Sequence, residues 1–144
     1  MTIIMSTSTK NGRQKMKGIE LLLLGAGGLV GTFLRFKITE SPLLWDTLPL
    51  NVLIVNVIGS LVIGIFAVVS QQWNLDARYM FFVAIGFCGA LTTMSSFVLE
   101  ASNLFDNRQY FIMAINVLTN VGLSLGAVMG GKVLTSAILA GGFR

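Results

Sequence analysis

The chain has 144 residues, of which 54% are hydrophobic and only 11% are charged, and its formal net charge is +4. A soluble domain usually carries about 25% charged residues, so this composition predicts an integral membrane protein. The chain has no histidine and a single cysteine, which excludes an internal disulfide and a His/Cys metal cluster. With no histidine and no paired acids, an enzyme is not predicted.

Four basic residues crowd the polar leader, residues 1–17: Lys10, Arg13, Lys15 and Lys17. The apolar run that follows continues to Phe36, which is longer than the apolar part of a signal peptide, and further apolar runs come after it. We interpret the leader as a retained, basic cytoplasmic tail. So short a patch favours contact with anionic lipid over binding of nucleic acid.

Four runs are long and apolar enough to cross a membrane, which takes roughly 20 residues per helix. They cover about residues 19–38, 50–70, 79–105 and 110 to the late 130s. The sequence therefore predicts an all-α membrane protein with four transmembrane helices per subunit. Residues 18–144 form this domain, and the protein is expected to be a multi-pass protein of the cell membrane.

The basic residues outside the leader divide nearly evenly between the two sides, with Arg78, Lys132 and Arg144 on one side and Arg35, Lys37 and Arg108 on the other. The bias in lysine and arginine sets the orientation of a membrane protein. A bias this weak lets a chain insert in both orientations, although the leader favours a cytoplasmic N-terminus.

Glycines recur at four-residue spacing in two of the predicted spans. Gly27 and Gly31 do so in the first span, and Gly122, Gly126 and Gly130 do so in the fourth. This spacing lines small residues along one helix face and lets neighbouring backbones approach closely. We expect these helices to pack tightly and the protein to form an oligomer.

Polar residues inside the spans are the first candidates for function. Asn56, in the second span, offers two amide hydrogens and one acceptor oxygen. These groups either bond a neighbouring helix or are presented to a passing solute, and the sequence leaves both open. Asn120 and Ser124 share one face of the fourth span.

The third span contains the stretch GALTTMSSF, residues 89–97, which is rich in hydroxyl groups. Such a stretch predicts a helix that is broken near its middle. Freed backbone groups are tolerated in a membrane only where they face protein, water or an ion. The break is then either satisfied by neighbouring helices or binds a cation through its carbonyls. Phe97 adds a ring edge, which carries partial positive charge and suits an anion.

Two charged residues lie near the ends of the spans. Glu100 follows Phe97 by about one turn, and Arg35 lies near the end of the first span, where an arginine is expected to reach the interface or to pair. No carboxylate lies in the middle of a span, which argues against a proton-coupled transporter built on a membrane-embedded acid.

Three motifs resemble the CrcB/Fluc family of fluoride channels, in order and at family-like spacing: GAGGLVGTFLRF, LNVLIVNVIGSLVIG and GFCGALTTMSSFVLE. The resemblance covers about residues 18–140. It implies an antiparallel, dual-topology dimer with two fluoride pores and a central structural Na+. The implied function is passive, fluoride-selective export that lowers cytoplasmic fluoride.

The resemblance also implies roles for single residues. The fluoride pathway would consist of Asn56, Thr93, Met94, Ser96, Phe97 and Ser124. The backbone carbonyls of Gly89 and Thr92 would hold the sodium ion, while Arg35 and Glu100 would have vestibule or structural roles.

Two positions depart from the family pattern. Met94 replaces the first phenylalanine of a pair, and Val128 stands where relatives often have threonine. Methionine fills the space but lacks the ring quadrupole. A homodimer is the expected assembly, and a heterodimer with a paired family member is the alternative.

Two other functions compete with the channel. A small four-span drug or cation transporter would need an acid in the middle of the first span, but Glu20 lies at the entrance of that span. A non-transporting membrane scaffold would explain the glycine faces of the fourth span. It would not explain Asn56 or the hydroxyl cluster.

Overall fold

The structure is a computed structural model that describes residues 18–40, 44–45 and 48–141. The predicted basic tail, residues 1–17, lies outside the described residues, as do residues 142–144 of the predicted domain. The elements in chain order are α1 (Gly18–Thr39), β1 (Leu44–Trp45), β2 (Leu48–Pro49), α2 (Asn51–Gln72), α3 (Ala77–Met80), the π-helix η1 (Phe81–Cys88), α4 (Gly89–Leu91), α5 (Met94–Asp106) and α6 (Tyr110–Gly141). The two short strands pair antiparallel in the link between α1 and α2.

Four helical runs are long and apolar enough to cross a membrane: α1, α2, the run Ala77–Asp106 and α6. Their lengths are 22, 22, 30 and 32 residues, and a span takes roughly 20 residues. The two longest therefore exceed the hydrocarbon thickness and require tilt or extension into the interface. The prediction of four transmembrane helices is confirmed.

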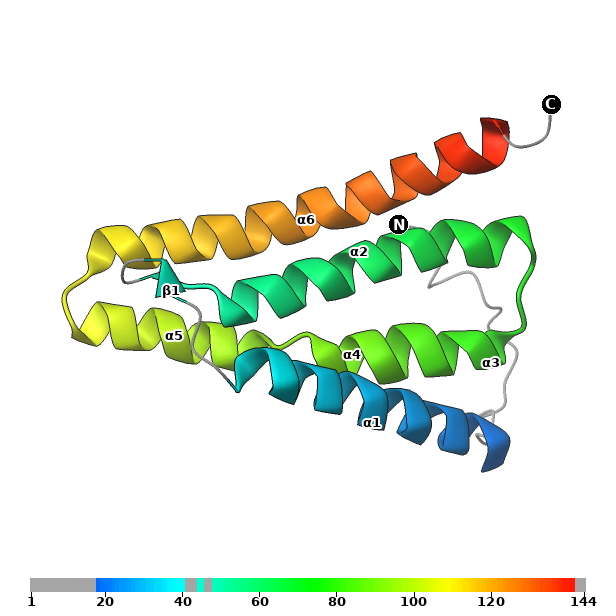
Figure 1. Cartoon of the computed structure of the whole chain (residues 1–144), viewed down its shortest axis with the longest axis horizontal. Helices are drawn as coiled ribbons and strands as arrows, with labels where there is room; N and C mark the ends of the chain where they lie inside the picture. Colours follow the sequence, from blue (N-terminus) through cyan, green and yellow to red (C-terminus); the bar gives the residue numbers. More distant parts are fainter. Residues whose placement is uncertain (1–17, 41–43, 46–47, 142–144) are drawn as a thin grey trace, which may run out of the picture.

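The spans associate as two pairs (Figure 1). α2 packs along α6, and α1 packs along η1 and α4. Contacts between α2 and η1 and between α5 and α6 join the two pairs. The start of α1 and the end of α6 lie at the same end of the bundle (Figure 1). α2 is therefore flanked both by α6 and by the third span.

Glycines mark the closest helix contacts, but only some of the predicted ones. A side chain at Gly27 would overlap the Phe82 carbonyl oxygen, so this part of the first span lies directly on η1, as its spacing predicts. In the fourth span, Gly131 has this role instead, because a Cβ there would lie 2.8 Å from the Leu61 carbonyl oxygen of α2. Within the described residues, the predicted stripe of Gly122, Gly126 and Gly130 faces open space.

We expect Gly27→Val to destabilise the fold strongly, because the added methyl groups meet backbone that cannot move aside. Overpacking of this kind costs about 1–3 kcal/mol or more. Gly28→Val is the matched control, since a Cβ at Gly28 meets no described atom within 4 Å. Melting temperature and recovery of folded protein in detergent are the measurements. Equal losses for both variants would contradict the predicted contact.

The third span is interrupted between α4 and α5 (Figure 1). Thr92 has φ −78° and ψ 154°, and Thr93 has φ −148° and ψ 114°, so both are extended. Gly89 remains helical, with φ −64° and ψ −32°. The non-helical backbone is thus two residues long: Thr92, which ends the predicted stretch from Gly89 to Thr92, and Thr93, which follows it. It follows a π-helical segment, a feature that often occurs at functional sites.

Candidate ion pathway beside the third span

Two threonines terminate the helices on either side of the interruption. The Thr92 hydroxyl donates to the Cys88 carbonyl at 2.9 Å, within the preceding turn. The Thr93 hydroxyl accepts from the Ser96 amide at 3.2 Å and thereby caps the N-terminus of α5. The interruption is therefore built from local side-chain bonds that threonine and serine favour.

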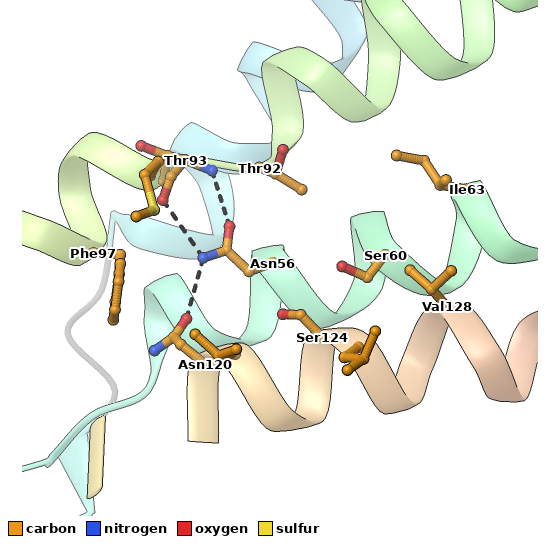
Figure 2. Close-up of a pocket in the computed structure, with 12 residues that line it drawn as sticks. Asn56, Ser60, Ile63, Thr92, Thr93, Phe97, Asn120, Ser124 and Val128 are labelled. Atoms are coloured by element: carbon orange, nitrogen blue, oxygen red, sulfur yellow. Dashed lines mark hydrogen bonds between the residues drawn. The ribbon is translucent and has the colours of Figure 1, made fainter. Parts of the chain in front are cut away.

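Asn56 of α2 bonds the interrupted backbone directly. The Thr93 N–H donates to Asn56 Oδ1 at 2.9 Å, and Asn56 Nδ2 donates to the Thr93 carbonyl at 3.5 Å. Figure 2 shows both bonds. In an unbroken helix the Thr93 N–H would bond the Gly89 carbonyl four residues earlier. Asn56 thus accepts the hydrogen bond of the Thr93 N–H, which the interruption leaves without its helical acceptor.

The amide bonds continue from α2 into α6. Asn56 Nδ2 donates to Asn120 Oδ1 at 3.1 Å (Figure 2). Asn120 Nδ2 donates in turn to Asn116 Oδ1 at 2.7 Å. The exposed fractions of Asn116 and Asn120 are 1% and 4%. Asn116 was not among the residues predicted from the sequence, although it lies one turn before Asn120 on the same helix face.

A first cavity of about 470 Å³ lies between α2, the interruption and α6. Its lining is neutral and consists of Asn56, Ser60, Ile63, Thr92, Thr93, Met94, Phe97, Asn120, Val121, Ser124, Leu125 and Val128. Figure 2 shows the polar side chains arriving from all three elements. Ser60 was also missed, although it follows Asn56 by one helical turn. The structure thus brings together Asn56, Thr93, Met94, Phe97 and Ser124.

A second cavity of about 430 Å³ holds the two charged candidates, Arg35 and Glu100. Ser96 lies here and not on the first cavity, whereas Thr93 lines both. The Thr93 hydroxyl donates to the Ser96 hydroxyl at 3.1 Å. Thr93 therefore lies between a neutral cavity and a charged one, with its hydroxyl partner Ser96 on the charged side.

Three buried polar atoms have no hydrogen-bond partner among the described residues: Glu100 Oε2, Asn116 Nδ2 and Ser124 Oγ. Ser124 faces the first cavity. Buried polar groups are usually hydrogen-bonded. The Ser124 hydroxyl is an exception, so it could donate to a ligand in this cavity.

Two carbonyl groups at the interruption lie outside regular helical bonding. The Gly89 carbonyl does not accept from the Thr93 N–H, because that N–H bonds Asn56 instead. The extended backbone at Thr92 turns the Thr92 carbonyl out of the helix. Carbonyl oxygens are ligands that hard cations accept. No cluster of three acidic, histidine or cysteine side chains occurs in the described part of the chain. The residues present therefore fit a cation held by backbone oxygens.

Comparison with known proteins identifies the family. A family model described as CrcB-like protein, Camphor Resistance (CrcB), matches residues 22–132. The chain belongs to the CrcB family. This confirms the family predicted from the three sequence motifs.

Relatives in the CrcB family align over nearly their whole length. A protein of Nitrosopumilus maritimus named fluoride-specific ion channel FluC is 63% identical over 125 residues, which cover 87% of this chain and 99% of the relative. Proteins of the same name from Methanocaldococcus jannaschii and Methanococcus maripaludis are 40% and 37% identical, covering 83% and 79% of this chain and 96% and 93% of the relatives. These relatives are named as channels, not as enzymes. Together with its four apolar spans, they identify the chain as a multi-pass membrane protein.

Proposed function

We propose that the chain forms a fluoride-selective ion channel, through which fluoride leaves the cell passively and cytoplasmic fluoride falls. The observation that carries this proposal is the first cavity, because its described lining combines neutral hydrogen-bond donors with apolar side chains and no charge. The names of the aligned relatives support fluoride as the ion.

A neutral lining suits a small, tightly hydrated anion. The pore must replace the water around fluoride without trapping the ion, so binding has to be moderate. The bond from Asn56 Nδ2 to the Thr93 carbonyl, at 3.5 Å, lies at the limit for a hydrogen bond. That amide hydrogen is therefore only weakly held by the carbonyl and can be shared with an anion at little cost. Ser124 adds a free hydroxyl, and buried Phe97 adds a ring edge.

Fluoride would reach the first cavity past the hydroxyl cluster of Thr93 and Ser96. These residues connect it to the cavity that holds Arg35, whose positive charge concentrates anions at an entrance. In this proposal Arg35 and Glu100 belong to a vestibule. The narrowest part of the proposed fluoride pathway is the part beside Asn56.

We further propose that two copies assemble as an antiparallel, dual-topology homodimer with two pores. Met94 lines the first cavity and is nevertheless 70% exposed, so the described chain leaves that side of the cavity open. A second copy would cover it. If the protein purified alone forms dimers that conduct fluoride, an obligate heterodimer with a paired family member is excluded.

A central sodium ion would join the two subunits through the carbonyls of Gly89 and Thr92. One chain contributes two such oxygens, whereas a hard cation takes more ligands than two. A symmetry-related copy would supply the rest. The positive charge would offset the cost of exposing these carbonyls within the membrane.

The direct test of the proposed function is fluoride efflux from proteoliposomes, followed with a fluoride electrode, with chloride efflux as the control. We expect rapid fluoride efflux and negligible chloride efflux. Absent fluoride efflux, or chloride efflux at an equal rate, would overturn the channel.

Met94→Phe should raise the fluoride rate, because a ring edge in the first cavity attracts the anion where a thioether does not. A few-fold increase is expected, because a ring edge carries only partial positive charge. Met94→Leu, which has no ring and similar volume, is the matched control. A rate for Met94→Phe no higher than that of the wild-type protein, or no higher than that of Met94→Leu, would contradict this expectation.

A further inference from the structure

We infer that Asn120 positions the Asn56 amide by taking up one of its two hydrogens, and that Asn116 holds Asn120 in turn. Asn120 lines the first cavity without a role assigned to it above, and Asn116 lies outside that lining. The inference rests on the proposed function, because it explains how Asn56 binds an anion only moderately. The inference is based on three asparagine side chains that bond one another in sequence, Asn56 on α2 and then Asn120 and Asn116 on α6.

Backbone groups terminate this series at both ends. The Thr93 N–H, which can only donate, bonds Asn56 Oδ1 at 2.9 Å. The Asn116 backbone carbonyl, which can only accept, receives a bond from Asn120 Nδ2 at 3.3 Å. Between these ends, Asn56 Nδ2 donates to Asn120 Oδ1 at 3.1 Å. These bonds therefore run in one direction, from the third span to α6, and the long contact from Asn56 Nδ2 to the Thr93 carbonyl runs the other way.

The two ends leave the asparagines no alternative orientation. The oxygen and nitrogen of an amide are usually hard to tell apart, and the bonding network decides between them. If Asn56 flipped, its NH2 group would face the Thr93 N–H, donor against donor. If Asn120 flipped, its oxygen would face the Asn116 carbonyl, acceptor against acceptor. Either flip leaves buried groups unpaired, which is costly in an apolar environment.

The orientation of Asn120 determines how many donors Asn56 offers. One Asn56 hydrogen is committed to Asn120, and the other makes the long contact with the Thr93 carbonyl at 3.5 Å. The pathway therefore meets a single loosely held hydrogen. Without the Asn120 oxygen, a second hydrogen would lack an acceptor, and an anion in the first cavity would supply it. Fluoride would then bind more tightly and leave more slowly.

The test is fluoride flux per dimer as a function of fluoride concentration, for proteins that elute as folded dimers. We expect Asn120→Leu to lower both the maximal rate and the half-saturating fluoride concentration, by about two- to tenfold each, the equivalent of one hydrogen bond. Asn116→Leu should shift both in the same direction but less, because the Asn116 backbone carbonyl still accepts from Asn120. It also provides the test if Asn120→Leu does not fold.

Thr135→Val is the matched control, since the buried Thr135 hydroxyl bonds the Gly131 carbonyl of its own helix at 2.7 Å and lines neither cavity. It should behave as wild type. If Asn120 contacted fluoride as a donor itself, its loss would instead raise the half-saturating concentration. A rise, or no change, overturns the inference, whereas a merely structural role would change the yield and melting temperature alone.

Failure of the proposed function is distinguishable from failure of this inference. If the wild-type protein moves no fluoride, the channel is overturned, and the amide series is tested by thermal unfolding of Asn56→Ala, Asn120→Ala and the double variant. Bonded partners should be non-additive, so the double variant should lose less than the sum of the single losses. Additive losses would overturn the series as well.

Discussion

Asn56→Leu should reduce fluoride efflux from proteoliposomes by about tenfold or more while the protein still elutes as a dimer. The substitution keeps the volume of the side chain but removes its amide hydrogens from the first cavity. It also leaves the Thr93 N–H without its partner at 2.9 Å. The fluoride rate falls because the anion loses a donor: a hydrogen bond to a charged group is worth about 1.5–3 kcal/mol, and about 1.4 kcal/mol corresponds to tenfold in rate.

Asn103→Leu is the matched control for this experiment. Asn103 is an exposed asparagine of α5 and lines neither of the two cavities. It should conduct as wild type. A non-transporting scaffold would show no fluoride efflux even as the wild-type protein. A channel whose pathway avoids α2 would conduct fluoride normally in the Asn56→Leu variant. Unchanged efflux in Asn56→Leu would therefore move the pathway away from the first cavity.

Sodium should stabilise the purified dimer, and replacing sodium by choline should lower its melting temperature. The proposed ligands are the carbonyls of Gly89 and Thr92, which the interruption removes from normal helical bonding. An ion that binds the folded state but not the unfolded chain stabilises by about 2.7 kcal/mol at a hundredfold excess over its dissociation constant. The melting temperature should therefore rise with the logarithm of the sodium concentration.

Asn56→Leu should weaken this response to sodium. Without Asn56 Oδ1, the Thr93 N–H is free to bond the Gly89 carbonyl, as in a regular helix, and would compete with the ion for that oxygen. Asn103→Leu should keep the full response. Identical melting temperatures of the wild-type protein in sodium and choline would contradict a stabilising sodium ion, whatever the fluoride flux.

Several features of the molecule were predictable because they depend on local sequence. The four spans follow from the length and apolar composition of four runs of the sequence. Such runs form helices because every backbone N–H and C=O in lipid must be hydrogen-bonded. Gly27 was assigned to a close helix contact from its spacing, and it does lie against η1. The stretch GALTTMSSF contains the residues at which the third span is interrupted.

Other features depend on which helices are neighbours. The spacing of Gly122, Gly126 and Gly130 predicted packing as well as the spacing of Gly27 did, yet the α2 crossing uses Gly131. Periodicity identifies a face of a helix, but it does not say which face meets a partner in the same chain. Asn116 was missed for the same reason, since one asparagine in a span gives no sign of an amide on another helix.

The sequence by itself determined the class of the protein, its four spans and the family, because composition and short motifs carry that information along the chain. Only the tertiary structure decided what Asn56 does. Its amide bonds the Thr93 peptide unit, 37 residues away, and the Asn120 side chain, 64 residues away. The helix interruption and the asparagine are therefore one site, because the N–H that the interruption releases must find an acceptor inside the membrane.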